Sequence, residues 1–225
     1  MQKKVSVVFL LLAVLFTVCL ITSNLLATKV FSLGGIALPC AVLVFPLSYV
    51  LGDCFTEVWG YRLARLVIWT AFAMNFFVIL LGQLSVWLPA APFWDGAEHF
   101  NYLFQMAPRV AVGSLLAFLA GSTVNAWVLS RMKIASRGKR FPLRAIVSSL
   151  AGELTDSLIF LPIAFWGADS RSLLQMMAAQ VTFKVAYEIL VLPVTRRFVR
   201  FLKHVEGMDA YDEGISYNPF RITDL

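Results

Sequence analysis

Acidic side chains stand inside runs of the sequence that are otherwise apolar. Asp53 and Glu57 are four residues apart in one run, and Glu153 and Asp156 are three residues apart in another. On a helix, either spacing places both carboxylates on one face. If these runs cross a membrane, each charge costs about 2.5 to 3.5 kcal/mol at the helix centre. We therefore expect the acids to serve binding.

A second polar stripe lies in the last apolar run, where Gln180, Lys184 and Glu188 follow at steps of four residues. Asn24 and Asn125 add neutral donors and acceptors in two further runs. The alternative interpretation is that Lys184 neutralises one acid and the asparagines hold helices together. One such ion pair is expected.

The acids outnumber this lysine. Those left over must be protonated, hydrated or matched by a ligand, although Glu57 is also close in sequence to Arg62 at the inner interface. Carboxylates suit a ligand with parallel N–H donors, such as the amidine-like edge of a guanine-type base. Tyr49 and Phe160 each stand one turn from an acid and could be aromatic walls, although core packing or lipid contact is the commoner role of an aromatic ring. The predicted substrate-binding residues are Asn24, Tyr49, Asp53, Glu57, Asn125, Glu153, Asp156, Phe160, Gln180, Lys184 and Glu188.

The amino-acid composition indicates the environment in which these residues lie. Of 225 residues, 60% are hydrophobic and 14% charged, and the mean hydropathy is +0.79, which is typical of a membrane protein. The net charge of +6 comes from basic residues between apolar runs, so we expect a lipid bilayer and no nucleic acid as partner. The three cysteines match no metal motif and His99 and His204 are far apart, so no metal or cofactor is expected.

Six apolar runs have about the 20 residues that a membrane-crossing helix needs. They are Val5–Thr28, Pro39–Trp59, Leu66–Leu88, Ala107–Leu129, Phe141–Trp166 and Leu173–Phe198. A turn through Ser32–Gly35 joins the first two, and a loop from Pro89 to Gln105 follows the third. We predict an all-α membrane protein with a six-helix domain over residues 1–203. The polar tail 204–225 is expected to be a loosely ordered cytoplasmic extension.

Basic residues set the predicted orientation. With six spans, every cluster of lysine and arginine falls on one side, which places both ends of the chain in the cytoplasm. The first run lacks a small-x-small cleavage site, so we interpret it as a helix rather than a signal peptide.

The two halves of the chain also contain similar motifs at a similar spacing. Asn24 precedes Gly52-Asp53 by nearly the same distance as Asn125 precedes Gly152-Glu153. Two three-helix halves must insert with opposite topology, and such inverted repeats hold substrate at their interface in many secondary transporters. Chance remains the alternative explanation for so few matched positions.

Four strings resemble the queuosine precursor transporter family, also called the vitamin uptake transporter group. They are residues 23–29 (SNLLATK), 52–60 (GDCFTEVWG), 151–157 (AGELTDS) and 182–188 (TFKVAYE). Together they extend over nearly the whole chain from Asn24 to Arg197. The resemblance implies import of 7-deazaguanine bases, the cyano and aminomethyl precursors of queuosine used in tRNA modification, through the bacterial inner membrane. A homodimer is compatible with the sequence.

Two other functions stay open at this stage. The chain could be the substrate-binding subunit of an energy-coupling-factor vitamin importer, in which case a partner must supply the ATPase because no Walker loop is present. An intramembrane aspartyl enzyme is the other alternative, since Asp53 and Asp156 lie on different predicted helices and could approach each other. Neither aspartate stands in a context that indicates cleavage, so we expect no enzyme activity.

Overall fold

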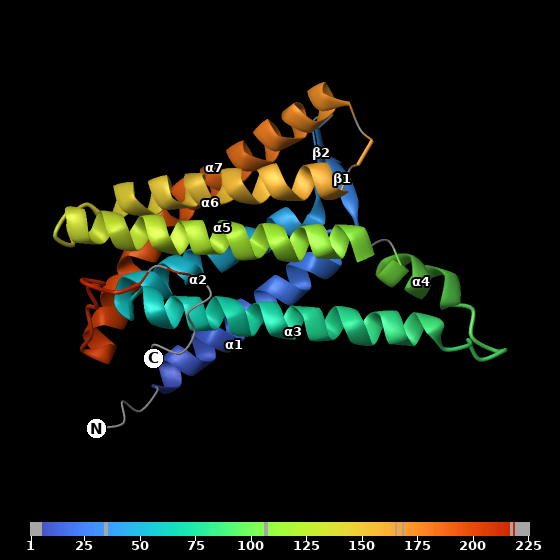
Figure 1. The fold of residues 1–225 in the computed structure, drawn as a ribbon, viewed down its shortest axis with the longest axis horizontal. Helices are drawn as coiled ribbons and strands as arrows, with labels where there is room; N and C mark the ends of the chain where they lie inside the picture. The colour runs from blue at the N-terminus through green and yellow to red at the C-terminus, as the bar shows by residue number, and fades with distance from the viewer. Residues whose placement is uncertain are drawn as a thin grey trace.

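In the part of the chain that the computed structural model describes, five helices are long and apolar enough to cross a membrane. They are α1 (Val7–Leu26), α3 (Tyr61–Trp87), α5 (Pro108–Ala135), α6 (Phe141–Ala164) and α7 (Ser170–Glu206). The structure describes residues 6–33, 36–105, 108–164, 166–167, 169–216 and 218. The long helices form an elongated bundle that exposes large apolar side chains such as Leu11, Phe77 and Leu190 (Figure 1). The fold agrees with the prediction of a multi-pass helical membrane protein.

The second predicted span, Pro39–Trp59, is not one long helix. It consists of the short 3₁₀ helix η1 (Cys40–Leu43) and of α2 (Phe45–Val58), which has 14 residues, fewer than the roughly 20 that cross a membrane. Pro46 lies in the first turn of α2, where proline is tolerated because its missing N–H would be unpaired anyway. Nearly all side chains of α2 are buried, so neighbouring helices rather than lipid surround it.

A two-stranded hairpin departs from the purely α-helical prediction. Strand β1 (Val30–Leu33) pairs antiparallel with β2 (Ile36–Pro39), and Val30 lies opposite Pro39. The predicted turn falls partly on residues 34–35, outside the described part. The predicted loop before α5 contains the short helix α4 (Ala97–Gln105). We call this end of the bundle the hairpin end, and we call the opposite end, where α5 connects to α6, the α5–α6 end (Figure 1).

Several helices are longer than their apolar runs. α3 starts at Tyr61, so Arg62 and Arg65 lie in its first turns rather than in a link. α5 continues to Ala135 and α7 to Glu206, past the predicted ends at Leu129 and Phe198. Lysine and arginine are good helix formers, so a helix continues where its hydrophobic stretch stops. The fifth predicted run reaches Trp166, whereas α6 ends at Ala164; residue 165 lies outside the described part.

Helices α5 and α6 are in close contact in the middle of the bundle. A Cβ atom added to Gly152 would lie 2.9 Å from the carbonyl oxygen of Gly121, so the two backbones touch. Small residues permit this kind of approach between membrane helices. On the other side, α1 packs on α2 through aromatic rings, with the centroids of Phe9 and Phe55 5.4 Å apart. α2 is thereby held between α1 and the α5–α6 pair.

Candidate functional site

Lys184 connects α7 to both acids of α6. Its Nζ lies 2.5 Å from Oε2 of Glu153 and 3.2 Å from Oδ2 of Asp156, and all three side chains are buried. The same ammonium lies 4.0 Å from the ring centroid of Phe45, a favourable cation–π contact at the start of α2. The sequence predicted one ion pair for Lys184, and the structure gives it two carboxylates.

A second buried group surrounds Tyr49 on α2. Asn125 Nδ2 donates to Oδ1 of Asp53 over 2.8 Å, which ties α5 to α2. The phenol of Tyr49 lies within electrostatic range of the carboxylates of Asp53, Glu153, Asp156 and Glu188. Its hydroxyl has no hydrogen-bond partner among the described residues.

The charges inside the bundle do not balance. Among the described residues, the four acids around Tyr49 face one buried lysine of this region, Lys184. The others must take up protons, water or a ligand, since unpaired charges are costly there. The predicted excess of acid is therefore present in the folded chain.

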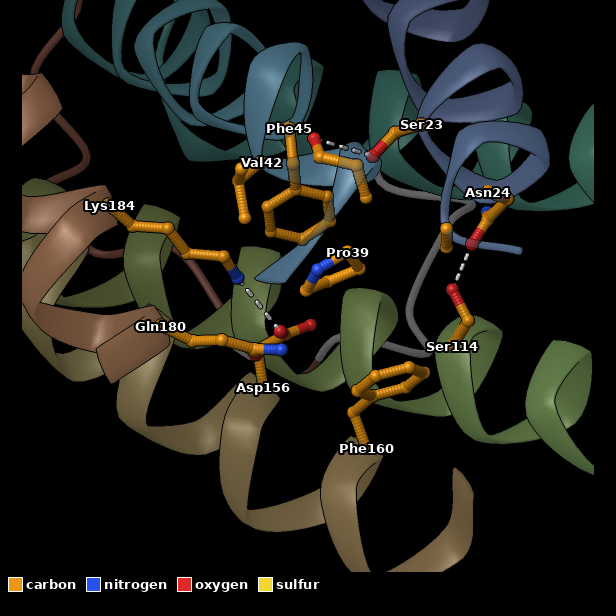
Figure 2. A pocket seen from close by; sticks show the side chains of 12 residues that line it. Ser23, Asn24, Pro39, Val42, Phe45, Ser114, Asp156, Phe160, Gln180 and Lys184 are labelled. Carbon is orange, nitrogen blue, oxygen red and sulfur yellow. Dashed lines mark hydrogen bonds and ion pairs between the residues drawn. The ribbon is translucent and has the colours of Figure 1, made fainter. Parts of the chain in front are cut away.

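A cavity opens beside Lys184, between α1, α2, α5, α6 and α7 at the hairpin half of the bundle. It holds about 430 Å³ of free space, including its open mouth. Figure 2 shows Lys184, Gln180 and Asp156 close together on one side of the cavity and Asn24 and Ser114 on the opposite side. The serine hydroxyl donates a short hydrogen bond to Oδ1 of Asn24. The cavity thus offers a carboxylate, an ammonium, amides and a hydroxyl over a short distance.

Five predicted site residues line this cavity. They are Asn24, Asp156, Phe160, Gln180 and Lys184. Five others form the buried shell behind it, namely Tyr49, Asp53, Asn125, Glu153 and Glu188. Sequence reasoning missed Phe45 and Ser114, which also line the cavity. A phenylalanine or serine in an apolar run carries no signal of its own, because both are common there.

Glu57 lies apart from this site, at the α5–α6 end. Arg144 binds it through two parallel hydrogen bonds, 2.5 Å to Oε2 and 2.9 Å to Oε1. Lys203 contacts Oε1 at 2.7 Å, and Lys133 donates to the backbone oxygen of Glu57 over 2.5 Å. Arg62, its neighbour in sequence, is exposed. The structure thus gives Glu57 three basic partners from α5, α6 and α7, away from the cavity.

The tail after α7 is not loosely ordered where the structure describes it. The C-terminal segment, residues 207–216, folds back onto the α5–α6 end. Asp209 accepts from Lys133 at 2.6 Å and forms an ion pair with Lys203 at 2.9 Å. Partial burial raises the pKa of Asp209, but the hydrogen bonds from the two lysines outweigh it and hold the pKa below its ordinary value. These contacts explain the order, since they compensate the cost of fixing a polar segment.

Asp212 in the same segment caps the start of α3. Both its carboxylate oxygens lie 3.0 Å from the backbone N of Tyr61, and Ser130 donates to Oδ2. A carboxylate at a helix N-terminus satisfies an unpaired N–H and interacts favourably with the helix dipole. Gly60 makes room for it, because its φ is +89° and an added Cβ would lie 2.8 Å from Oδ1 of Asp212. The C-terminal segment is thus part of the folded bundle.

Long apolar helices around buried charges and a polar cavity define a multi-pass membrane protein built for a small polar ligand. The family model described as "Putative vitamin uptake transporter" matches residues 39–198. The chain belongs to this vitamin uptake transporter family, and it is a transporter rather than an enzyme.

Two curated relatives carry more specific names. The chain is 26% identical to the "Probable queuosine precursor transporter" of Bacillus subtilis (strain 168), over 79% of this chain and 77% of the relative. It is 30% identical to the "Queuosine precursor transporter" of Escherichia coli (strain K12), over 68% of this chain and 66% of the relative. No solved structure matches the chain significantly.

Proposed function

We propose that the protein imports queuosine precursors, the 7-deazaguanine bases with a cyano or aminomethyl group, through a bacterial inner membrane. The observation that carries the proposal is the cavity, in which the carboxylate of Asp156 lies beside the amide of Gln180 and across from the amide of Asn24 (Figure 2). The names of the two relatives support the substrate class.

The polar groups of the cavity match the edges of such a base. Asp156 accepts the two parallel N–H groups of the guanine-type edge, which favours a bidentate pair. Gln180 and Asn24 complete the polar edge with donors and acceptors. The rings of Phe45 and Phe160 lie on the cavity wall and stack on a flat heterocycle.

The Lys184 contacts suggest how the site exchanges partners. Lys184 is closer to Glu153 (2.5 Å) than to Asp156 (3.2 Å). When a base arrives, the lysine keeps its charge paired with Glu153 and leaves Asp156 to the ligand. Lys184 and Asp156 then each keep a hydrogen-bonding partner, which lowers the cost of separating the two charges.

Alternating access follows from the position of the two polar groups along the bundle. The cavity lies in the hairpin half, while Glu57 and its three basic partners close the α5–α6 end. Arginine and lysine collect at the α5–α6 end, which supports a cytoplasmic location for it and for both ends of the chain. In this interpretation the structure is closed toward the cytoplasm, and release requires the Glu57 cluster to separate.

A sixth crossing and an inverted repeat belong to the same proposal. η1 and α2 together lead from the hairpin end to the α5–α6 end, inside the protein, where irregular backbone is tolerated. α2 and α6 run in opposite directions, and their motifs Gly52-Asp53 and Gly152-Glu153 both approach Asn125. Antiparallel helices with the same motif at one asparagine support two halves of opposite topology.

Transport by the purified chain tests the function. In liposomes without any ATPase, we expect uptake of radiolabelled 7-cyano-7-deazaguanine. Asp156→Asn should lower binding about tenfold or more, because the neutral amide loses a charge-assisted pair. The matched control is Glu98→Gln, an exposed acid of α4, which should bind as the wild type does.

Two outcomes contradict the proposal. If the wild-type protein does not bind 7-cyano-7-deazaguanine, the proposed substrate is wrong. Uptake that occurs only after a partner ATPase is added favours the binding subunit of an energy-coupling-factor importer instead.

A further inference from the structure

A second cavity lies next to the first one, on the far side of a thin wall. It holds about 550 Å³ of free space, including its open mouth, between α1, α3, α4 and α5. Among the described residues, Asn24, Ala27 and Ser114 line both cavities, so their side chains lie between the two spaces. Nothing in the transport proposal uses this second space.

Asn75 is the unexplained polar residue of the second cavity. It stands on α3, is 1% exposed, and its Nδ2 has no hydrogen-bond partner among the described residues. An unpaired amide in a membrane helix is costly, so a bound group that accepts from it would stabilise the protein. The sequence gives no sign of a role for Asn75, because a lone asparagine in an apolar run has no spacing pattern.

The wall between the cavities has a free donor as well. Asn24 accepts from Ser114 through its Oδ1, while its Nδ2 is buried and has no partner among the described residues. Asn24 and Asn75, each with a buried Nδ2 that has no partner among the described residues, therefore both belong to the lining of the second cavity. Because Asn24 belongs to both linings, a base held at Asp156 would reach the second cavity past this side chain.

The rest of the lining is apolar. Described apolar side chains of the second cavity include Ile21, Leu25, Val78, Ile79 and Leu103. No carboxylate is among its lining residues in the described part, whereas Asp156 lines the first cavity. The second cavity therefore suits a neutral group that accepts hydrogen bonds and does not suit an ammonium, whose charge would be unpaired there.

We propose that the second cavity is a subsite for the substituent of the base, and that Asn75 binds a small neutral acceptor there by donating from Nδ2. The inference rests on the proposed function, with the base itself held at Asp156. A nitrile accepts such a hydrogen bond and is neutral, while an aminomethyl group is a cation. The subsite thus makes the protein bind the cyano base more tightly than the aminomethyl base.

Binding measurements on the purified full-length protein test this subsite. The probes are 7-cyano-7-deazaguanine, its 7-aminomethyl counterpart and unsubstituted 7-deazaguanine. The wild type should bind the cyano base about tenfold more tightly than the aminomethyl base, the effect of one well-placed hydrogen bond. Asn75→Leu should remove this advantage and leave the Kd of the unsubstituted base within about twofold. Met74→Leu, the exposed neighbour on α3, is the control and should leave all three affinities unchanged.

A second variant keeps the proposal testable if Asn75→Leu folds poorly. Asn75→Asp is nearly equal in size and supplies a carboxylate, so it should reverse the preference toward the aminomethyl base. Equal weakening of all three bases by Asn75→Leu, or unchanged preference in Asn75→Asp, would show a structural role and overturn the subsite alone. If the wild type binds none of the three bases, the proposed function fails together with it.

Discussion

Lys184 is the residue on which the buried charges depend most. It is the shared partner of Glu153 and Asp156, and its ammonium also lies against the ring of Phe45. Replacement by methionine keeps a long flexible side chain but leaves two buried acids without their cation. We expect Lys184→Met to destabilise the protein by about 3 to 5 kcal/mol, the usual cost of removing one partner of a buried pair.

Thermal unfolding in detergent measures this effect. At higher pH, where more of the acids are ionised, the loss for Lys184→Met should be larger than at pH 5. Arg171→Met, which alters an exposed cation near the start of α7, is the matched control. Equal melting temperatures of Lys184→Met and the control would contradict the assignment.

Asp209 gives the C-terminal segment a dependence on pH. Its pKa lies below the ordinary value in the folded protein, so ionised Asp209 stabilises the docked segment. This contribution is fully present above the ordinary aspartate pKa, and it is lost as the pH falls through the lower pKa of the folded state. Limited proteolysis with pepsin across pH 2 to 5 should show cleavage in residues 207–216 rising toward acid. Asp209→Asn should remove most of that dependence, and a wild-type profile in this variant would contradict the role of the carboxylate.

From the sequence, a residue could be predicted to belong to the candidate site when its type is unusual inside a membrane. Acids and a lysine in apolar runs stand out, and their helical spacing groups them on faces. Their partners could not be predicted, because a pair such as Glu57 and Arg144 forms between distant segments. Nearness in sequence suggested Arg62 for Glu57, but Arg62 stands on the exposed side of α3. Asn75 and Ser114 gave no signal, since their roles arise only when the helices meet.

At the level of the elements, the glycines of α2 and α6 have different surroundings despite their shared motif. A Cβ on Gly152 would lie 2.8 Å from Cε1 of Tyr49 and 2.9 Å from the Gly121 oxygen. A Cβ on Gly52 would meet nothing closer than 3.9 Å. The two positions therefore form a matched pair in which only one helix contact is tight.

Alanine substitutions should separate the two glycines. Gly152→Ala pushes α6 away from α5 and displaces Tyr49, so we expect a loss of about 1 to 3 kcal/mol and weaker substrate binding. Gly52→Ala should be neutral or slightly stabilising, because alanine is the better helix former by about 1 kcal/mol. Melting temperatures and base binding of both variants check this, and equal behaviour of the two would contradict the close α5–α6 contact.

The helices also show where prediction from hydrophobic runs succeeds and where it fails. Hydrophobic runs identified the five long helices, since each has a continuous apolar stretch of sufficient length. The same rule failed for α2, because an apolar run of 21 residues contains a 14-residue helix that protein rather than lipid surrounds. Hydropathy measures how apolar a segment is, and it does not tell whether lipid or protein provides the apolar surroundings.

For the whole molecule, the polar groups are distributed along the bundle in a way that suits a carrier. The cavity and Asp156 lie in the hairpin half, while ion pairs and the C-terminal segment close the α5–α6 end. Opening of this end requires these ion pairs and hydrogen bonds to separate. The basic residues that indicate orientation in the sequence therefore include Lys133, Arg144 and Lys203, which hold that end together.

Removal of the C-terminal segment tests this closure. A chain ended after Glu206 loses Asp209, the partner of Lys133 and Lys203, and Asp212, which caps α3. Cys54 lies one turn deeper than Glu57 and is fully buried. If the segment helps to close the α5–α6 end, a small thiol reagent should label Cys54 about tenfold faster in the shortened chain, through more frequent local opening. Cys40, half-buried toward the hairpin end, serves as an internal control whose rate should not change. An unchanged Cys54 rate in a shortened protein that remains monodisperse would show that Glu57 and Arg144 close this end without the segment.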